Sequence, residues 1–270
     1  MVITTFIGAG NMANSLIGGL IGKGHNPEQI IASDPNPDAL AKLTEAFAIV
    51  AEGDNQKACL KADIVVLAVK PQVMKVVAEN LRPTLKHRPL IISIAAGISC
   101  DQLSQWLDND LAIVRCMPNT PALVGIGASG LYANVNVDEV QKQAAEQLLN
   151  AVGISIWLDK EALIDTVTAV SGSGPAYFFL LMEAMVSSGV KQGLTQDQAL
   201  QLTLQTAAGA AKLAKTSGIT LQELRQRVTS PGGTTEQAIH SFEQSGFSKI
   251  VDDAMVACSE RSQAMAKEFS

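Results

Sequence analysis

The amino-acid sequence predicts an α/β protein with two domains: a sheet domain at residues 1–160 and an all-helical domain at residues 161–270. Three observations support this prediction. Strand-like runs alternate with helix-like segments in the first part of the chain, a glycine-rich turn follows the first run, and no strand-like run occurs after residue 161. With 270 residues, 47% of them hydrophobic, the chain is long enough to bury two cores.

The strand-like runs of the first domain are short and apolar throughout. Strands of a parallel sheet are buried on both faces and therefore lack the alternating pattern of half-exposed strands. The runs lie at Val2–Ile7, Ile30–Ala32, Ile64–Val69, Leu90–Ala95, Ala112–Met117 and Gly127–Ala133. A helix is expected at Ala13–Gly22, and further helices between the runs would cover both faces of a parallel sheet.

The second domain reads as a succession of helices separated by glycine and proline turn signals. The expected helices are Glu161–Gln192, Gln196–Ser217, Leu221–Val228, Thr235–Gln244 and Lys249–Lys267. The stretch Gln196–Lys215 consists mainly of Ala, Leu, Gln and Thr, with charges only near its ends. It lacks the polar face of a surface helix, so it is either a well-covered core helix or part of an intertwined homodimer, which we favour.

Composition and charge exclude several classes of protein. The net charge of -6 and the absence of a basic cluster argue against nucleic-acid binding. Met1 leads directly into a strand-like run, and Glu183 interrupts the apolar run Ala176–Val186, so neither a secretory signal nor a membrane span is expected. The four cysteines are widely spread, and no metal-ligand spacing occurs. We therefore expect a cytoplasmic protein with reduced thiols and no metal.

A glycine-rich turn follows the first strand-like run and opens the first helix. Its G-x-G-x-x-A pattern is the dinucleotide-binding fingerprint of Rossmann domains, although a purely structural turn is the alternative. The first glycine permits the tight turn, the second lets the backbone approach a diphosphate, and the alanine allows close packing of helix on strand. The diphosphate would bind free N–H groups at the helix N-terminus. The expected cofactor contacts are Gly8, Ala9, Gly10, Asn11, Met12 and Ala13.

The second run ends at Ser33 and Asp34, where Rossmann domains read the adenosine ribose. An acidic residue at this place hydrogen-bonds the ribose 2′-hydroxyl and repels a 2′-phosphate, so Asp34 favours NADH. Ser33, in contrast, could donate to a phosphate. Alternatively, Asp34 is a turn residue before Pro35 and points away from the cofactor.

A third cofactor segment ends the buried run at Ala68, Val69, Lys70 and Pro71. Ligands of open α/β sheets bind beyond the carboxyl ends of the strands, so this segment is expected to lie against the ribose or phosphates. Lys70 is either a phosphate or ribose contact or a solvated lysine. Asn55 is expected to reach the adenosine half of the cofactor.

The segment Thr229–Thr235 (TSPGGTT) lies between two expected helices. In one interpretation it is structural: Pro-Gly-Gly makes a turn, and Thr234 and Gln237 have the spacing of a capping box. In the other, helix-terminal N–H groups bind a small carboxylate, and a threonine hydroxyl donates to a reacting nitrogen. The three histidines lie outside these motifs, so no strong general acid is evident. A cyclic imine needs less help, because its nitrogen is partly protonated near neutral pH and the resulting iminium carbon accepts hydride readily once it is positioned.

Together, the motifs resemble the pyrroline-5-carboxylate reductase family over essentially the whole chain. Two further segments contribute, Ser171–Tyr177 (SGSGPAY) and Arg115–Pro121 (RCMPNTP), and the stretch Ser230–Thr235 is diagnostic of the family. The resemblance implies a Rossmann domain followed by a helical dimerisation domain, with homodimers that can assemble into a decamer of five dimers. It also implies an active site where the cofactor of one subunit meets the helical domain of its partner.

The resemblance also implies roles for individual residues. Thr235 would be the catalytic residue that donates a hydrogen bond to the imine nitrogen of Δ1-pyrroline-5-carboxylate. The residues that would bind the substrate are Ser230, Gly232, Gly233, Thr234 and Thr235, and the first four of them would hold its carboxylate through backbone and hydroxyl donors. The product would be L-proline, and the cofactor NADPH by resemblance or NADH by the charge of Asp34.

The chain departs from the family pattern at two places, Asp34 and Ser217–Ile219 (SGI in place of Thr-Gly-Glu). One alternative activity is that of a β-hydroxyacid dehydrogenase, which would carry a catalytic lysine where this chain has Phe178. The other is a nucleotide-binding sensor without turnover.

Overall fold

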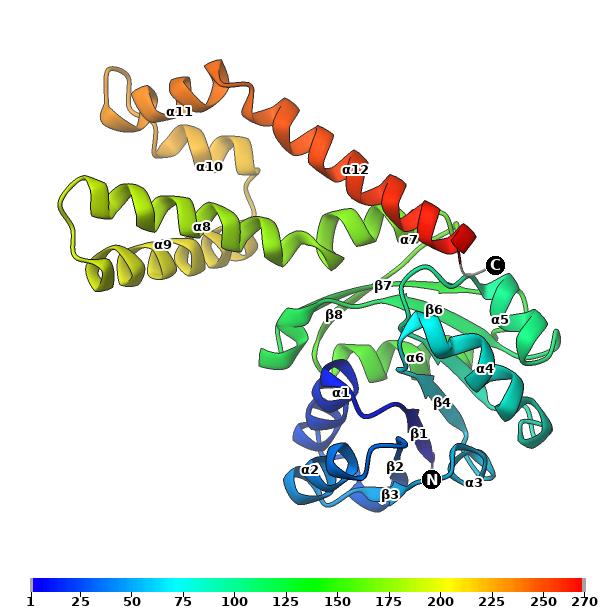
Figure 1. Ribbon diagram of the computed structural model, residues 1–270. Coiled ribbons are helices and arrows are strands. Elements are labelled where there is room, and N and C mark those ends of the chain that lie inside the picture. The colour runs from blue at the N-terminus through cyan, green and yellow to red at the C-terminus, as the bar shows by residue number, and fades with distance from the viewer. Residues whose placement is uncertain (1, 269–270) are drawn as a thin grey trace. The chain divides into compact units, whose positions relative to one another are not determined.

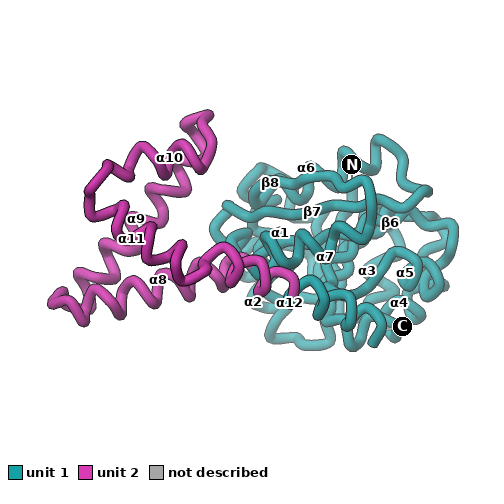
Figure 2. The backbone as a smooth tube through the Cα atoms, turned by 90° about the horizontal axis from the view of Figure 1, so that it is seen from above, with its two compact units in different colours: residues 1–173, 257–270 teal, residues 174–256 magenta. Residues whose placement is uncertain are grey.

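A computed structural model describes residues 2–268 (Figure 1). The chain divides into two compact units, which are coloured separately in Figure 2. Unit 1 consists of residues 1–173 and 257–270, and unit 2 of residues 174–256. The segment 161–173 therefore packs with the sheet unit, ahead of the helices of unit 2.

Unit 1 is built on one sheet, which has eight strands within the described part of the chain. The strands are β1 (Thr4–Ile7), β2 (Ile30–Ser33), β3 (Val50–Glu52), β4 (Ile64–Leu67), β5 (Leu90–Ser93), β6 (Ile113–Met117), β7 (Gly127–Ala133) and β8 (Gly153–Trp157). Their order is β3-β2-β1-β4-β5-β6-β7-β8, so the chain reverses direction across the sheet next to β1. This order and the helices between the strands confirm the predicted α/β class.

The expectation of a parallel sheet is wrong for one pair, because β7 runs antiparallel to β6. All other neighbouring pairs are parallel. The connection 118–126 contains only a short 3₁₀ helix, η3 (Thr120–Val124). A parallel return needs a crossover of about a dozen or more residues, so this short connection dictates the antiparallel pairing.

The two outermost strands, β3 and β8, are not expected from the sequence. Both lie at edges of the sheet, where one side of the strand lacks a neighbour. In β8 exposed and half-buried residues alternate, and Ile154 and Ile156 point to solvent. Edge strands of this kind do not form the continuous apolar runs by which the interior strands were recognised.

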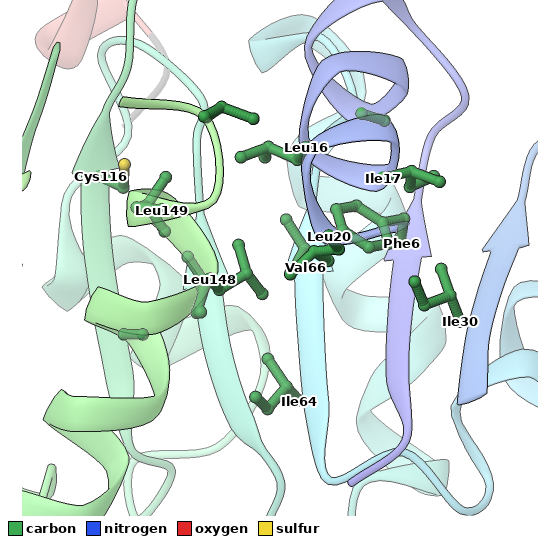
Figure 3. Close-up of a cluster of buried hydrophobic side chains, with 14 of the residues drawn as sticks. Phe6, Leu16, Ile17, Leu20, Ile30, Ile64, Val66, Cys116, Leu148 and Leu149 are labelled. Carbon is green, nitrogen blue, oxygen red and sulfur yellow. The ribbon is translucent and has the colours of Figure 1, made fainter. Parts of the chain in front are cut away.

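Helices cover both faces of the sheet, and each face has its own core. One face is covered by α1 (Asn11–Gly22), α2 (Pro37–Phe47) and α6 (Glu139–Asn150), and its core includes Phe6, Leu16, Ile64, Val66 and Leu149 (Figure 3). The other face is covered by α3 (Asn55–Cys59), α4 (Pro71–Leu81) and α5 (Cys100–Trp106), with Val65, Leu67, Met74 and Leu103 in its core. Short 3₁₀ helices lie at η1 (Pro27–Gln29) and η2 (Arg82–Thr84).

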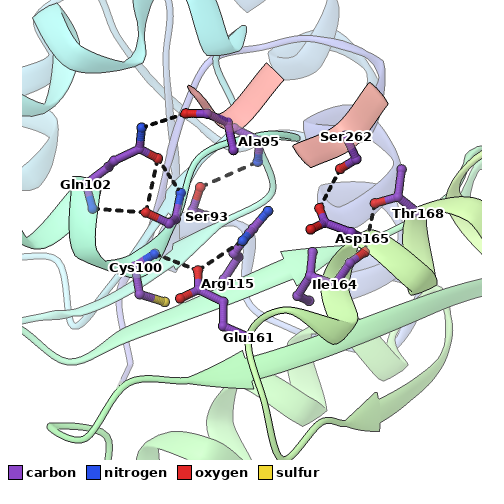
Figure 4. Close-up of polar contacts among 12 residues, drawn as sticks. Ser93, Ala95, Cys100, Gln102, Arg115, Glu161, Ile164, Asp165, Thr168 and Ser262 are labelled. Atoms are coloured by element: carbon purple, nitrogen blue, oxygen red, sulfur yellow. Dashed lines mark hydrogen bonds and ion pairs between the residues drawn. The ribbon is translucent and has the colours of Figure 1, made fainter. Parts of the chain in front are cut away.

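The last part of unit 1 consists of α7 (Leu163–Val167), a π-helical turn, η4 (Thr168–Gly172), and the end of α12 (Phe247–Glu268). Ser262 of α12 donates a hydrogen bond to Asp165 of α7 at 2.6 Å (Figure 4). In the same region Glu161 accepts hydrogen bonds from the buried Arg115 at 3.0 Å and from the backbone N–H of Cys100 at 2.8 Å. These contacts attach α7 and the end of α12 to the sheet unit.

Unit 2 contains only helices. They are α8 (Gly174–Lys191), α9 (Gln196–Thr216), α10 (Leu221–Arg227), α11 (Thr234–Gln244) and the first part of α12. The predicted absence of strands after residue 161 is confirmed within the described residues. Few residues of this unit are buried in the single chain, and they are Gly174, Val186, Ala199 and Thr203.

One expectation about membrane spans needs correction. The π turn joins α7 and α8 into one helix at residues 163–191, whose length and composition would allow it to cross a membrane. Its most apolar window is only 17% buried in the single chain. Glu183 interrupts the apolar run but does not lower the mean hydropathy enough to exclude such a helix. Apolar helices with this composition also form interfaces between the subunits of oligomers.

Candidate functional site

The glycine-rich turn connects β1 to α1, and its first glycine is required by geometry. Gly8 has φ +107°, a conformation that side chains rarely adopt. A Cβ atom at this position would lie 2.7 Å from the carbonyl oxygen of Ala68, at the end of β4. The N–H of Gly8 donates to the carbonyl of Ser33 at 2.7 Å. The turn is thus packed against the ends of two neighbouring strands.

The second glycine of the turn faces open space. Gly10 is the N-cap residue of α1, and no side chain caps the helix there. A Cβ at Gly10 would meet no atom within 4 Å, in contrast to Gly8. The N–H groups of the first helical turn, Asn11–Ala13, have no intrahelical acceptor. Free N–H groups, a helix N-terminus and open space together fit a diphosphate.

A groove of about 580 Å³ lies beside this turn, at the carboxyl ends of the strands. It brings together four of the residues predicted to bind a cofactor: Gly8, Ser33, Asn55 and Val69. The remainder of the wall was not predicted, and consists of Pro35, Gly53, Asp54, Gln56, Val73, Val77 and Asn80. The spacing of Val73, Val77 and Asn80 along one side of α4 could have indicated it, because residues three and four apart share a helix face.

Ser33 determines how Asn55 presents its amide to this groove. The Ser33 side chain is fully buried, and its hydroxyl donates to Oδ1 of Asn55 at 2.7 Å. Because the amide oxygen is engaged, the amide NH₂ is the group available to a ligand. Asn55 can therefore donate to a ribose or phosphate oxygen.

The carboxylate of Asp34 is bound to the backbone through both of its oxygens. One oxygen accepts from the N–H of Ala9, in the glycine-rich turn, at 2.8 Å. The other accepts from the N–H of Asn36 at 2.8 Å. Asp34 thus fixes the conformation of the turn and also leaves a negative charge next to the groove.

The segment after β4 contributes mainly backbone. Ala68 and Val69 are half-buried against the glycine-rich turn, whereas Lys70 is exposed and is not part of the groove wall. Lys70 is the N-cap residue of α4, and Pro71 occupies the first helical position, where its missing N–H costs nothing.

The Ser230–Thr235 loop lies entirely in unit 2 and opens α11. Gly232 has φ +72°, and a Cβ at Gly233 would lie 2.9 Å from the carbonyl oxygen of Ser230. That carbonyl accepts from the N–H of Gly233 at 2.9 Å, and the carboxylate of Glu236 accepts from the N–H of Gly232 at 2.8 Å. Both glycine N–H groups therefore have partners, one within the loop and one in the first turn of α11.

The capping box at Thr234 and Gln237, the structural alternative for this segment, does not form. The helix begins one residue earlier than that motif requires, with Gly233 as N-cap and no side-chain cap. Thr234 and Thr235 are the first two residues of the helix, so their N–H groups have no intrahelical acceptor. Within the described residues, the half-buried Thr235 hydroxyl has no hydrogen-bond partner. The loop thus presents two N–H groups and a hydroxyl to a ligand.

The remaining reactive groups do not suggest another centre. Burial raises the pKa of three thiols to about 12, which keeps them protonated and unreactive: Cys59, Cys100 and Cys116. In residues 2–268 no three side chains of His, Cys, Asp or Glu gather as metal ligands.

Two family models match the chain, one on each part of the molecule. The first, described as NADP oxidoreductase, coenzyme F420-dependent, matches residues 4–97. The second, described as pyrroline-5-carboxylate reductase dimerisation, matches residues 161–265.

Relatives match over nearly the full length. The curated pyrroline-5-carboxylate reductase of Pseudomonas aeruginosa is 57% identical over 98% of this chain and 97% of its own. The structure of the reductase from Coxiella burnetii has a TM-score of 0.95 and 42% identity over 98% of both chains. The Plasmodium falciparum enzyme, whose crystal structure contains NADP, has a TM-score of 0.88 and 32% identity over 98% of both chains.

These likenesses extend over both units, and they agree with the groove beside the glycine-rich turn and with the loop that opens α11. They favour neither the β-hydroxyacid dehydrogenase nor the sensor without turnover. The chain belongs to the pyrroline-5-carboxylate reductase family.

Proposed function

We propose that this NAD(P)H-dependent reductase converts Δ1-pyrroline-5-carboxylate to L-proline with the cofactor groove of unit 1 and the Ser230–Thr235 loop of unit 2. The groups that each region presents support the assignment of the cofactor to unit 1 and of the substrate to unit 2. The glycine-rich turn offers N–H groups and space for a diphosphate, and the loop offers N–H groups and a hydroxyl for a small anion. Full-length identity with curated reductases supports the reaction itself.

In the groove, Gly10 and the N–H groups of Asn11–Ala13 hold the diphosphate, and the amide NH₂ of Asn55 donates to the adenosine half. Ala9 lies in the turn and Ala68 packs against it, whereas Pro71 begins α4, the helix whose Val73 and Val77 line the groove. Lys70, exposed at the rim, can screen phosphate charge. Bound in this way, the reduced nicotinamide supplies the hydride that the imine carbon accepts while the nitrogen retains a proton.

In the loop, the N–H groups of Thr234 and Thr235 bind the substrate carboxylate, with the Ser230 hydroxyl as a further donor. The turn through Gly232 and Gly233 sets their direction. The Thr235 hydroxyl donates to the substrate nitrogen as hydride addition gives that nitrogen the lone pair of the amine in proline. A single positioned hydroxyl is sufficient, because the protonated imine is already electrophilic.

For the cofactor, we propose a preference for NADH over NADPH, with both accepted. The charge of Asp34 beside the groove disfavours a 2′-phosphate. Ser33 is bound to Asn55 and is fully buried, so it is not free to donate to such a phosphate. The NADP held by the Plasmodium falciparum enzyme supports the acceptance of NADPH.

The functional unit we propose is a homodimer, in which the groove of one subunit works with the loop of its partner. The helices of unit 2 expose large apolar side chains in the single chain: Phe178, Phe179, Leu180, Leu181, Leu200, Leu202, Leu204 and Leu213. Exposed apolar surface on this scale requires cover, and a second copy of the chain supplies it. A decamer of five dimers is the further assembly that the family resemblance implies.

We place the dimerisation domain at residues 161–270, behind a cofactor domain at residues 1–160, and the enzyme in the cytoplasm. The family match that begins at residue 161 supports the boundary. Residues 161–173 then belong to the helical domain by sequence while packing with the sheet unit.

Thr235→Ala tests the assignment of the donor. Loss of one transition-state hydrogen bond lowers kcat by roughly 10- to 100-fold. Thr235→Ser, which keeps a hydroxyl, restores most of the rate. Thr216→Ala, an exposed threonine of α9, serves as the control and keeps the wild-type rate. An unchanged kcat in Thr235→Ala removes this residue from its role.

A further inference from the structure

Asn119, directly beyond β6, connects three parts of unit 1 through one buried side chain. It is 9% exposed. Its amide oxygen accepts from the N–H of Ala128, in β7, at 2.9 Å. Its amide NH₂ donates to the carbonyl of Ser171, in the π turn, at 3.0 Å. The side chain therefore ties the end of β6 both to the neighbouring strand and to the π turn.

The Ser171 carbonyl needs this partner because of the sequence that follows. A helical carbonyl normally accepts from the N–H four residues later, and that residue here is Pro175, which has none. The turn instead closes with a wide bond from the N–H of Ser173 to the carbonyl of Thr168 at 2.8 Å. Turns of this width are rare and occur frequently at functional sites.

A second contact fixes the π turn against β6. A Cβ atom at Gly172 would lie 2.7 Å from Cε of Met117, the last residue of β6. Only a glycine allows this approach without movement of the methionine. The strand end and the π turn are thus held together by the Asn119 hydrogen bond and by the close packing at Gly172.

The position of this junction on the sheet relates it to the cofactor. The groove in which we place the adenosine half lies at the carboxyl ends of β1, β2, β3 and β4. An extended dinucleotide continues across the carboxyl ends of the neighbouring parallel strands. These strands are β5 and β6, so the end of β6 lies on the nicotinamide side.

We propose that Asn119 is a positioning residue for hydride transfer, because it holds the π turn Thr168–Gly172 against the carboxyl end of β6, where the nicotinamide binds. The inference rests on the cofactor site proposed above. Asn119 is neutral and both ends of its amide are engaged, so it acts through the π turn and touches no reacting atom. Hydride transfer depends on the reacting atoms lying about 3–3.5 Å apart, and a displacement of about 1 Å costs roughly 100-fold in rate.

Asn119→Asp tests the proposal with little change in volume. The aspartate keeps an oxygen for the N–H of Ala128 but turns a second oxygen towards the Ser171 carbonyl, which it repels. We expect kcat to fall roughly 10- to 100-fold while KM and the cofactor dissociation constant change less than threefold. The primary isotope effect with 4-deuterated reduced cofactor rises, because hydride transfer becomes slower relative to product release.

The chain offers a matched control at the opposite end of β6. Asn134 also joins strand ends: its amide oxygen accepts from the N–H of Ile113 at 3.1 Å and its NH₂ donates to the carbonyl of Leu111 at 3.0 Å. Asn134→Asp makes the same chemical change away from the cofactor. We expect both variants to lower the Tm, and only Asn119→Asp to lower kcat and raise the isotope effect.

Equal kcat values in the two variants would overturn the proposal. A loss of activity in Asn119→Asp that is fully explained by weaker cofactor binding, with kcat unchanged at saturating cofactor, would overturn it as well. If Asn119→Asp does not fold, the neutral Asn119→Ser is measured in the same assays, with Asn134→Ser as its control. The activity of the wild type shows which of the two proposals fails, the reductase function or the positioning role of Asn119. A wild type that does not reduce Δ1-pyrroline-5-carboxylate contradicts the proposed function, whereas an active wild type with an unaffected Asn119 variant contradicts only the positioning role.

Discussion

The two glycines of the cofactor turn respond differently to the same substitution, because their surroundings differ. In Gly8→Ala the new methyl carbon lies 2.7 Å from the Ala68 carbonyl oxygen, on a backbone with φ +107°. In Gly10→Ala it meets no atom within 4 Å, on an extended backbone with φ -76° and ψ -179°. The first change therefore acts on stability, and the second on ligand binding.

For Gly8→Ala, the backbone conformation alone costs of order 1–3 kcal/mol, and the clash adds to it. A loss of about 2–4 kcal/mol lowers the Tm by roughly 5–15 °C in a chain of this size. For Gly10→Ala, the N-cap exchange changes stability by no more than about 1 kcal/mol. A methyl group in the diphosphate position removes one or two charge-assisted hydrogen bonds of about 1.5 kcal/mol each, which weakens cofactor binding roughly 10- to 100-fold.

Calorimetry gives the Tm of each variant, and titration of the fluorescence of the reduced nicotinamide gives the dissociation constant. The structure predicts that Gly10→Ala melts like the wild type and binds cofactor poorly. If Gly10→Ala binds the cofactor as tightly as the wild type, the diphosphate does not lie on this turn, and the reasoning from open space at Gly10 is refuted.

Three further predictions concern charges and thiols. Asp34→Asn keeps an acceptor for the N–H of Ala9 but removes the charge, so the ratio of kcat/KM for NADPH to that for NADH should rise about tenfold; an unchanged ratio means that the charge does not reach the 2′-position. Glu236→Gln should lower the KM for substrate several-fold, because it keeps an acceptor for the N–H of Gly232 but removes a negative charge that repels an anionic substrate at the neighbouring N–H groups of Thr234 and Thr235; a raised KM contradicts this. The thiols with a pKa raised to about 12 ionise earlier in the unfolded chain, so their contribution to stability is complete below about pH 8.5 and is lost as the pH rises towards 12; a Tm that does not fall in alkaline solution contradicts the burial of Cys59, Cys100 and Cys116.

The interior of the sheet unit could be predicted because burial leaves a direct mark on sequence. Strands such as Ile64–Leu67 are apolar throughout, since both faces are covered, and the glycine-rich turn has a fixed spacing. The helices of the second part were recognised by length and by their glycine and proline boundaries. The edge strand Gly153–Trp157 is not recognisable from the sequence, because its alternating pattern is short and half-exposed.

The finer features of the site depend on contacts between distant residues, which no local pattern encodes. The position of Asp34 at the end of a strand predicts a ribose contact or a turn residue, and neither interpretation predicts that its carboxylate binds the N–H of Ala9, 25 residues away in sequence. Likewise, the hydrogen bond from the Ser33 hydroxyl to Asn55 depends on how β2 and α3 pack. This hydrogen bond determines which way the amide of Asn55 points. The capping motif at Thr234 failed for a related reason, because the carboxylate of Glu236 binds the loop in place of a side-chain cap.

The reductase activity is tested most directly by mixing the purified full-length enzyme with Δ1-pyrroline-5-carboxylate and reduced cofactor, and following both nicotinamide oxidation and proline formation. We predict that oxidation depends on the substrate, that one L-proline forms for each cofactor oxidised, and that NADH supports a higher kcat/KM than NADPH. Oxidation of neither cofactor above the substrate-free background would contradict the account.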